Sequence, residues 1–284
     1  METFTQYFCR CGKEKFDAVL FDIDGTLSSG GRPLPGAKEI LTMLEKEKFP
    51  YVLLTNDSCN SHEEKAAILQ RGDIPVFKER IYSCGDVLKL WKKDTNYQGE
   101  LLFQCGKLGT PSYADLSGLR VTTNPAELPL CHGVIFGEGS YDWQPALEGI
   151  FNFFLARPDA PMVVVNPDSY WPSCTHSGMG IGSGAQARFV CAVLKDAGII
   201  VEPLYIGKPY PFIYRGIMAE LETLLGKKVL PERIAMVGDS LASDIKGANA
   251  NGLCSCLVLS GITTPELAEK AAAESKPQMI FSAV

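Results

Sequence analysis

Residues 16–26 read FDAVLFDIDGT, an apolar run that ends in two aspartates, a glycine and a threonine. The run from Phe16 to Phe21 is short and mostly apolar, which predicts a buried parallel strand. Side chains that follow such a strand lie at the carboxyl end of the sheet, where open α/β folds bind their ligands. Asp22 and Asp24 are therefore the first candidates for a functional site.

Three further polar patterns each follow a short apolar run. They are Thr55-Asn56 after residues 51–54, Gly207-Lys208-Pro209 after residues 204–206, and Gly238-Asp239-Ser240 after residues 234–237. A fourth aspartate, Asp244, lies five residues past Asp239. If each run is a parallel strand, all of these side chains gather at one end of the protein's strands.

Helical patterns separate the apolar runs. We expect helices over residues 37–48, 61–71, 211–225, 243–251 and 265–274. Strands that alternate with helices indicate βαβ units, so the fold class is α/β with a Rossmann-like parallel sheet.

The spacing of the patterns is uneven, because about 150 residues separate Asn56 from Lys208. One crossover helix needs far fewer residues. We therefore expect a discontinuous core domain over 1–80 and 203–284, and an inserted α/β domain over 81–202. Strands near 100–104, 133–136 and 162–165 and helices over 144–156 and 185–197 are predicted for the insertion.

Composition excludes several classes of protein. The chain has 284 residues, is 46% hydrophobic and carries a formal net charge of -6 without a basic block. This argues against nucleic acid and against anionic membrane surfaces as partners. No apolar stretch approaches the length of a membrane span, and residues 1–15 are too polar for a signal peptide, so the cytoplasm is the expected location.

The residue types predict phosphoryl transfer. The carboxylate of Asp22 can attack phosphorus in line and form an aspartyl-phosphate, but two anions must first be brought together. A divalent cation solves this problem, and Mg²⁺ suits carboxylate, phosphate and water oxygens. We take Asp22, Asp24 and Asp239 as the metal ligands. Asp24 is also placed to protonate the leaving oxygen and then to deprotonate water.

The other patterns supply groups that hold a phosphate. The Thr55 hydroxyl and the Asn56 backbone N–H can donate to phosphate oxygens, and Gly25 leaves room for them. Lys208 supplies a compact positive charge. Asp244 is expected to act one step back, by orienting Lys208 or metal-bound water.

These four motifs resemble those of the haloacid dehalogenase superfamily of phosphotransferases. The chain is similar in particular to subfamily IIA, the branch of p-nitrophenylphosphatase-like, phosphoglycolate and pyridoxal phosphatases, in which an α/β cap lies between the second and third motifs. The resemblance covers nearly the whole chain and includes Asn166-Pro167-Asp168 in the insertion. It departs from the family at Asp57, where a third carboxylate follows Thr55-Asn56. The preference of Asp for turns and caps favours an Asp57 that faces away as a helix cap.

The resemblance implies that the inserted cap selects the leaving group. We expect Asn166 at the substrate and His176 in the family's specificity loop. Trp171 can either stack on a flat leaving group or pack in the core. The resemblance also implies a homodimer formed through the cap.

The leading hypothesis is a Mg²⁺-dependent phosphomonoesterase that acts on a small phosphorylated metabolite, such as a sugar phosphate, phosphoglycolate, pyridoxal phosphate or a nucleotide. Two alternatives stay open: a phosphotransferase or phosphomutase that uses the same Asp22, and a protein that binds a phosphometabolite without catalysis. A non-catalytic protein predicts an eroded site, whereas every charged position is intact here.

Overall fold

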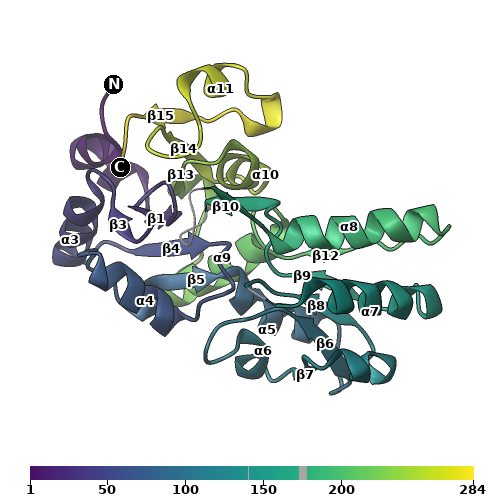
Figure 1. The fold of residues 1–284 in the computed structure, drawn as a ribbon. Helices are drawn as coiled ribbons and strands as arrows, with labels where there is room; N and C mark the ends of the chain where they lie inside the picture. Colours follow the sequence, from purple (N-terminus) through teal and green to yellow (C-terminus); the bar gives the residue numbers. More distant parts are fainter. Residues whose placement is uncertain (140, 173–177) are drawn as a thin grey trace. The chain divides into compact units, whose positions relative to one another are not determined.

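The computed structural model describes residues 1–139, 141–172 and 178–284. The chain forms two compact units, each described by itself below (Figure 1). Unit 1 comprises Met1–Thr55, His62–Tyr82 and Lys208–Val284, and unit 2 comprises Asn56–Ser61 and Ser83–Gly207. The unit borders at 82/83 and 207/208 lie a few residues past the predicted domain borders, and residues 56–61 join unit 2 as a separate piece.

Unit 1 is built on a six-stranded sheet with the order β15-β14-β13-β1-β4-β5. The strands are β1 (Ala18–Phe21), β4 (Tyr51–Thr55), β5 (Ile81–Ser83), β13 (Ile234–Gly238), β14 (Cys254–Val258) and β15 (Met279–Phe281). β1 pairs in parallel with both β13 and β4, at the centre of the sheet. All four residues of β1 are buried, as expected for a parallel strand that is covered on both faces.

The helices of unit 1 precede β1 or lie between its strands in the sequence. They are α1 (Phe4–Tyr7), α2 (Lys13–Lys15), α3 (Ala37–Glu47), α4 (His62–Arg71), α9 (Pro211–Leu225), α10 (Lys246–Ala250) and α11 (Pro265–Glu269). Single π-helical turns cover Phe8–Gly12 and Leu241–Ile245, short 3₁₀ turns cover Lys78–Arg80, Pro231–Arg233 and Ala273–Ser275, and a small hairpin joins β2 (Ser28–Ser29) to β3 (Arg32–Pro33). The helix predicted over 265–274 is shorter than expected and ends at Glu269.

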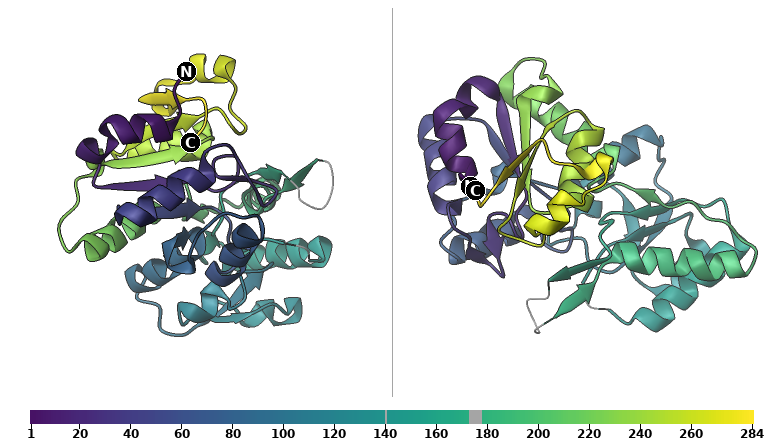
Figure 2. Two further views of the ribbon diagram at one scale, coloured as in Figure 1. Left: turned by 90° about the vertical axis from the view of Figure 1, so that its left-hand side faces the viewer. Right: turned by 90° about the horizontal axis from the view of Figure 1, so that it is seen from above.

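The structure contains N-terminal helices in unit 1 that the sequence analysis does not predict. Residues 1–15 are mostly polar, and their pattern does not reveal that two aromatic side chains are buried. Phe4 and Phe8 are fully buried and pack with Phe21 of β1 in one apolar cluster. The two ends of the chain lie together on unit 1 (Figure 2). There the Phe4 N–H donates to the Ala283 carbonyl over 2.9 Å.

Unit 2 has its own parallel sheet, with the order β12-β9-β8-β6-β7. Its strands are β6 (Leu101–Cys105), β7 (Arg120–Thr122), β8 (Val134–Phe136), β9 (Met162–Val164) and β12 (Leu204–Tyr205), and its antiparallel hairpin is β10 (Tyr170–Pro172) with β11 (Met179–Ile181). Its helices are α5 (Val87–Asp94), α6 (Tyr113–Leu116), α7 (Trp143–Ala156) and α8 (Ser183–Asp196), with 3₁₀ turns at Cys84–Asp86 and Pro125–Leu130. α7 and α8 contribute Phe154 and Leu194 to the apolar core of this unit.

One of the four apolar runs belongs to a different sheet than expected. Residues 204–205 form β12, which pairs with β9 at the edge of the unit 2 sheet. Lys208 therefore does not follow a strand of the sheet that carries Asp22. A short apolar run indicates a buried strand, but nothing in its composition says which sheet it joins.

The observed architecture is the predicted α/β class, with parallel sheets and flanking helices in both units. Among the described residues, no helix is both long and apolar enough to cross a membrane.

Candidate active site

Asp22 and Asp239 meet because their strands are direct neighbours. β1 and β13 pair with Phe21 opposite Val237, so the next residues of both chains emerge side by side at the carboxyl end of the sheet. The Asp22 backbone N–H continues the ladder and donates to the Val237 carbonyl over 2.8 Å. Both aspartates are buried.

Lys208 places an ammonium group between two of the carboxylates. Its side chain is buried, and Nζ lies 2.6 Å from Asp22 Oδ1 and 2.7 Å from Asp244 Oδ1. Nζ also donates to the Leu54 carbonyl over 2.9 Å, at the end of β4. These three partners fix the ammonium group beside Asp22, the candidate nucleophile.

Asp244 is positioned by the π-helical turn that begins at Leu241. Its Oδ2 accepts from the Ser240 N–H over 3.1 Å, while Oδ1 accepts from Lys208. Asp244 is buried as deeply as Lys208. Asp244 thus contacts the Lys208 ammonium group directly and is itself held by the backbone of Ser240.

Three carboxylates form the strongest candidate for a metal centre within the described residues. Ligand oxygens of Asp22, Asp239 and Asp244 all lie within 4.8 Å of one another. Together with Lys208 they leave an excess of two negative charges when ionised. A divalent cation would neutralise this excess, and an all-oxygen donor set suits Mg²⁺. The residues present therefore fit the ion, although the cluster contains Asp244 where we predicted Asp24.

The pKa shifts in the cluster also favour a bound cation. Burial raises the pKa of Asp22 well above its ordinary value, and the neighbouring carboxylates add to the effect although Lys208 opposes it. Burial, followed by the charge of Asp244, raises the pKa of Asp239 to about 7. Burial alone would lower the pKa of Lys208, but the charges of Asp22 and Asp244 raise it well above its ordinary value, so the ammonium form is retained.

Gly25 makes the close approach of the first motif to Asp239 possible. Its φ is +87°, and a Cβ at this position would lie 2.1 Å from Asp239 Oδ2. Both the left-handed backbone and the space exclude a larger residue.

Asp24 and Thr55 sit at the rim of the same strand ends. Asp24 is exposed, two residues past Asp22, in the turn that bridges back to Ser28. Thr55 is the last residue of β4 and is buried. Exposure suits an acid/base group that must exchange protons with water.

A loop that no motif signalled supports Asp239. The Ile262 N–H donates to Asp239 Oδ2 over 2.8 Å, and the Thr263 hydroxyl donates to the Asp239 carbonyl. The Ser260 hydroxyl donates to the Gly25 carbonyl over 2.9 Å. Residues 260–263 follow β14 as ordinary turn residues, and only the tertiary contact reveals their role.

The remaining predicted residues belong to unit 2. Asn56 and Asn166 are buried, and both take part in hydrogen bonds within that unit. Trp171 is 37% exposed on β10, where it pairs with Gly180 of β11. His176 lies outside the described residues.

Asp57, the departure from the family pattern, is used locally. Its Oδ1 accepts from the N–H groups of Cys59 and Asn60 over 2.8 and 3.1 Å, and its Oδ2 accepts from Asn60 Nδ2. This is the turn geometry that Asp commonly stabilises. The Asp57 carboxylate thus caps a turn in unit 2.

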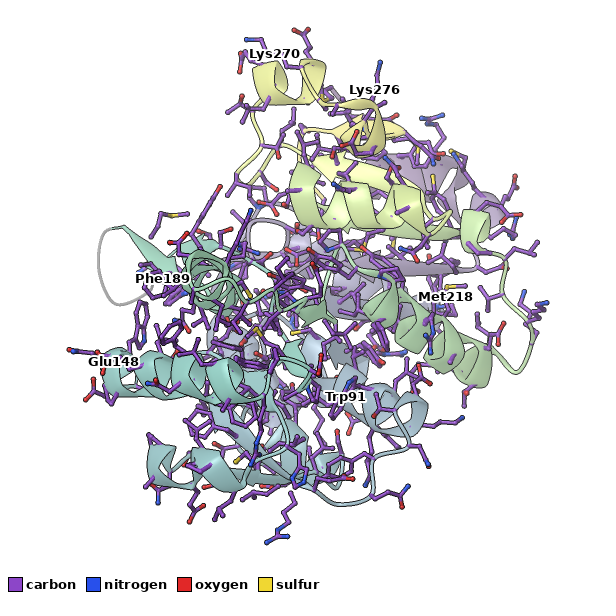
Figure 3. All side chains as sticks on the ribbon, turned by 90° about the vertical axis from the view of Figure 1, so that its right-hand side faces the viewer. Trp91, Glu148, Phe189, Met218, Lys270 and Lys276 are labelled. Atoms are coloured by element: carbon purple, nitrogen blue, oxygen red, sulfur yellow. The ribbon has the colours of Figure 1, made fainter. Side chains whose placement is uncertain are left out.

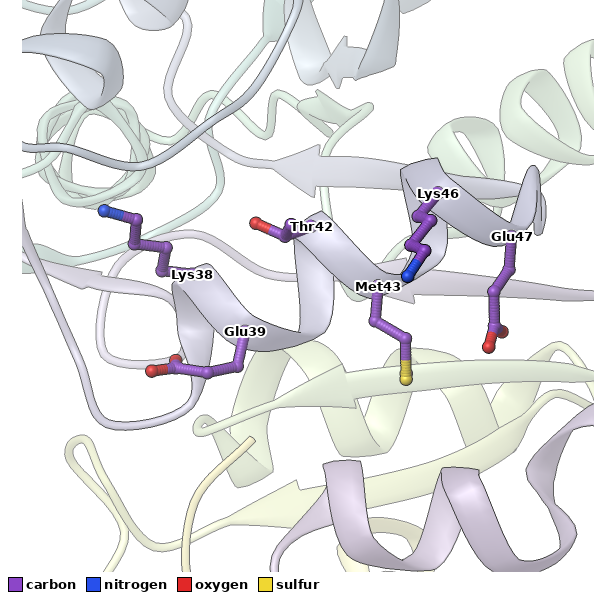
Figure 4. A pocket seen from close by; sticks show the side chains of 6 residues that line it. All are labelled: Lys38, Glu39, Thr42, Met43, Lys46 and Glu47. Atoms are coloured by element: carbon purple, nitrogen blue, oxygen red, sulfur yellow. The ribbon is translucent and has the colours of Figure 1, made fainter.

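A separate hollow lies along the outer face of α3 (Figure 4). Its lining residues are Lys38, Glu39, Thr42, Met43, Lys46 and Glu47. None of them belongs to the motifs, and mixed surface charges on one helix face offer no convergent polar groups, so we assign no chemistry to it.

Comparison with known proteins identifies the family. Residues 19–120 match the haloacid dehalogenase-like hydrolase family, and residues 205–284 match the HAD-hydrolase-like family. The two matches cover the segments that carry all four motifs.

Named relatives are phosphatases. The chain is 28% identical to dihydroxyacetone phosphatase from Corynebacterium glutamicum, across 87% of this chain and 82% of the relative. It is 29% identical to ribonucleotide monophosphatase NagD from Escherichia coli, across 87% and 88%.

The fold agrees with solved structures. Glycerol phosphate phosphatase from Mycobacterium tuberculosis, in complex with magnesium, superposes with a TM-score of 0.78 at 24% identity, covering 99% of this chain and 77% of that one. The chain therefore belongs to the haloacid dehalogenase superfamily, in the subfamily IIA branch of phosphoric monoester hydrolases.

Proposed function

We propose that this phosphatase hydrolyses a small phosphorylated metabolite through an aspartyl-phosphate on Asp22 and that it requires Mg²⁺. The observation that carries the proposal is the contact of Lys208 with Asp22 at 2.6 Å inside a cluster of three buried carboxylates. A nucleophile, a fixed positive charge and a metal-compatible donor set in one place are the groups that phosphoryl transfer needs.

In this mechanism Asp22 attacks the phosphorus atom while Asp24 donates a proton to the leaving oxygen. Asp24 then takes a proton from water, which attacks the aspartyl-phosphate and releases inorganic phosphate. Lys208 and Thr55 stabilise the charge of the transferring phosphoryl group. Mg²⁺, held by Asp22 and Asp239 with Asp244 beside them, would reduce the repulsion between the carboxylate and the phosphate.

We propose that unit 2 acts as the cap that selects the leaving group, with Trp171 and His176 among the residues that meet it. The relatives compared above are a dihydroxyacetone phosphatase and a ribonucleotide monophosphatase, which favours a small phosphate ester as the substrate. Substrate candidates for this chain are therefore sugar phosphates, glycerol phosphate, phosphoglycolate, pyridoxal phosphate and nucleotides.

The proposal is tested by measuring phosphate release from a panel of these esters, with Mg²⁺ and with a chelator. We expect release that depends on Mg²⁺ and a preference for one class of leaving group. Equal release in the chelator would contradict the metal requirement, and release from no ester would contradict the assigned substrate class.

Replacing Lys208 with alanine should lower the rate about a hundredfold or more, because one preorganised positive charge is lost. The metal-free variant should also lose about 3–5 kcal/mol of stability, because removing one partner of a buried ion pair leaves uncompensated charge. Steady-state kinetics and urea unfolding measure the two effects. Lys228→Ala, an exposed lysine in the same unit, is the control and should match the native chain in both.

Mg²⁺ should raise the midpoint of thermal unfolding more at pH 8 than at pH 6. The pKa of Asp239 is raised from 3.8 to about 7, so the folded protein holds this proton more tightly than the unfolded chain does. The free energy of unfolding of the metal-free protein therefore falls as the pH rises from 3.8 to about 7. Above this range the cluster is ionised, and a bound cation stabilises it most.

We expect a rise of about 5 °C or more at pH 8, with Mg²⁺ at a hundred times its dissociation constant. Asp239→Asn should lose most of this rise. A rise that is equal at the two pH values would show that proton release from the cluster is not linked to Mg²⁺ binding.

A further inference from the structure

A closed ring of hydrogen bonds lies within unit 2. Asn56 Nδ2 donates to Asp168 Oδ1 over 3.2 Å, and the Asp168 N–H donates to Asn166 Oδ1 over 2.8 Å. Asn166 Nδ2 donates to Glu138 Oε1 over 2.7 Å. Glu138 Oε2 accepts from both the N–H and the hydroxyl of Ser58, over 3.0 and 3.2 Å. The backbone from Asn56 to Ser58 completes the ring.

Glu138 is the member on which the ring depends. Both of its oxygens accept, and they take three donors from two separate segments of the chain. Its own backbone is fixed by a reciprocal bridge to Lys107, beyond the end of β8. No other ionic or polar side chain of similar shape accepts three donors without presenting one itself.

The surroundings make this carboxylate costly unless it is hydrogen bonded. Burial raises the pKa of Glu138 to about 7, the charges of Asp57 and Asp168 add to the rise, and the donors of Ser58 and Asn166 oppose it. A buried carboxylate beside two others persists when its hydrogen bonds offset the loss of hydration. The ring therefore has a specific geometry to maintain.

The ring adjoins two candidate catalytic residues through single peptide bonds. Asn56 follows Thr55 directly, and Gly207 precedes Lys208 directly. Gly207 is packed against the ring, since a Cβ there would lie 2.6 Å from both Asn56 Oδ1 and Pro167 Cδ. A shift of the ring would thus be passed along the backbone to both residues.

A third segment of the chain, Ser83–Cys84, also forms hydrogen bonds with the backbone that follows Thr55. The Cys84 thiol donates to the Asn56 carbonyl over 3.0 Å, and the Ser83 hydroxyl donates to the Asp57 carbonyl over 2.6 Å. Ser83 is the first residue of unit 2 after Tyr82. The segment that follows Thr55 is consequently fixed from two directions.

We propose that Glu138 is a positioning residue for phosphate hydrolysis, which acts through the ring to hold the backbone next to Thr55 and Lys208. In this role Asn166, whose amide oxygen and nitrogen both serve the ring, links Glu138 to Asp168 and has no direct part in binding the leaving group. The inference rests on the proposed function, because its main readout is the hydrolysis rate.

The test exchanges the two partners of one hydrogen bond. Glu138→Gln places an amide nitrogen where an acceptor is required, so one bond of the ring is lost. Asn166→Asp alone sets a second carboxylate against Glu138. In the double variant the new amide donates to the new carboxylate, the second oxygen at position 166 still accepts from the Asp168 N–H, and the total charge is unchanged.

We expect each single variant to lower kcat about tenfold or more, because small displacements of catalytic groups have effects of this size. KM should change less than kcat, and the loss should be equal for 4-nitrophenyl phosphate and glycerol phosphate, since the ring adjoins phosphate-binding residues. The double variant should recover most of the native kcat. The rate of hydrogen exchange at the Ser58 amide should rise in the single variants and return to the native rate in the double variant.

Glu148→Gln, on the outer face of α7 (Figure 3), removes an exposed glutamate from the same unit and should leave kcat and Ser58 exchange unchanged. The inference is overturned if Ser58 exchange rises while kcat stays native, or if the double variant is no better than the singles. Failure of the proposed function is seen separately, as a native chain that releases no phosphate.

Discussion

Asp22→Asn should abolish phosphate release on every ester that the native chain hydrolyses. An amide is a far weaker nucleophile than a carboxylate, and it also weakens the set of oxygens available to Mg²⁺. We expect a fall of about 10⁴-fold or more, as when a nucleophile is removed from an otherwise intact site. Phosphate release under saturating ester and Mg²⁺ measures it.

The fold should survive this substitution. The buried Asp22 carboxylate has a raised pKa, chiefly through desolvation, and the charges of Asp244 and Asp239 add to the rise. A neutral side chain of the same size therefore removes this repulsion from the metal-free cluster, while Lys208 keeps Asp244 as its ion-pair partner. The midpoint of thermal unfolding should therefore not fall. Asp73→Asn, at an exposed position of the same unit with φ of +64°, is the matched control and should keep full activity. Turnover in Asp22→Asn would contradict the covalent mechanism.

Asp24→Asn should lower steady-state turnover about 10²–10⁴-fold by removing the general acid and base. The two half-reactions should respond differently. Esters with a good leaving group, such as 4-nitrophenyl phosphate, need little protonation and should still phosphorylate Asp22. Hydrolysis of the aspartyl-phosphate needs the base and should stall.

A rapid-quench experiment separates these half-reactions. We expect a burst of one equivalent of 4-nitrophenol per site, followed by a very slow phase. The phosphate should remain bound to the protein after the acid quench. Because Asp24 is exposed, its loss should barely change stability. A steady-state rate equal to that of the native chain would remove Asp24 from the acid/base role.

The sequence was most informative where local pattern and burial coincide. β1, β4 and β13 were predicted nearly to the residue, because their apolar runs are uninterrupted and each ends at a polar motif. Asp22 and Asp239 meet because those strands are neighbours, and this pairing of two distant segments is visible only in the structure.

Contacts between distant segments could not be predicted in the same way. Residues 260–263 support Asp239, and the ring around Glu138 joins segments that are up to 112 residues apart. Neither has a periodic pattern or a characteristic spacing. The assignment of residues 204–205 to the second sheet was missed for the same reason, since strand pairing depends on the whole chain.

The order of strands in unit 1 has a consequence for folding during synthesis on the ribosome. β1 and β4 are synthesised early, but β13, the other neighbour of β1, begins only at Ile234, after all of unit 2 has been synthesised. Until then one edge of β1 has no strand to pair with. An unpaired apolar edge invites association with other chains. Newly made chains of this protein should therefore be prone to association until β13 has emerged, whereas unit 2, almost continuous in sequence, can fold before β13 is made.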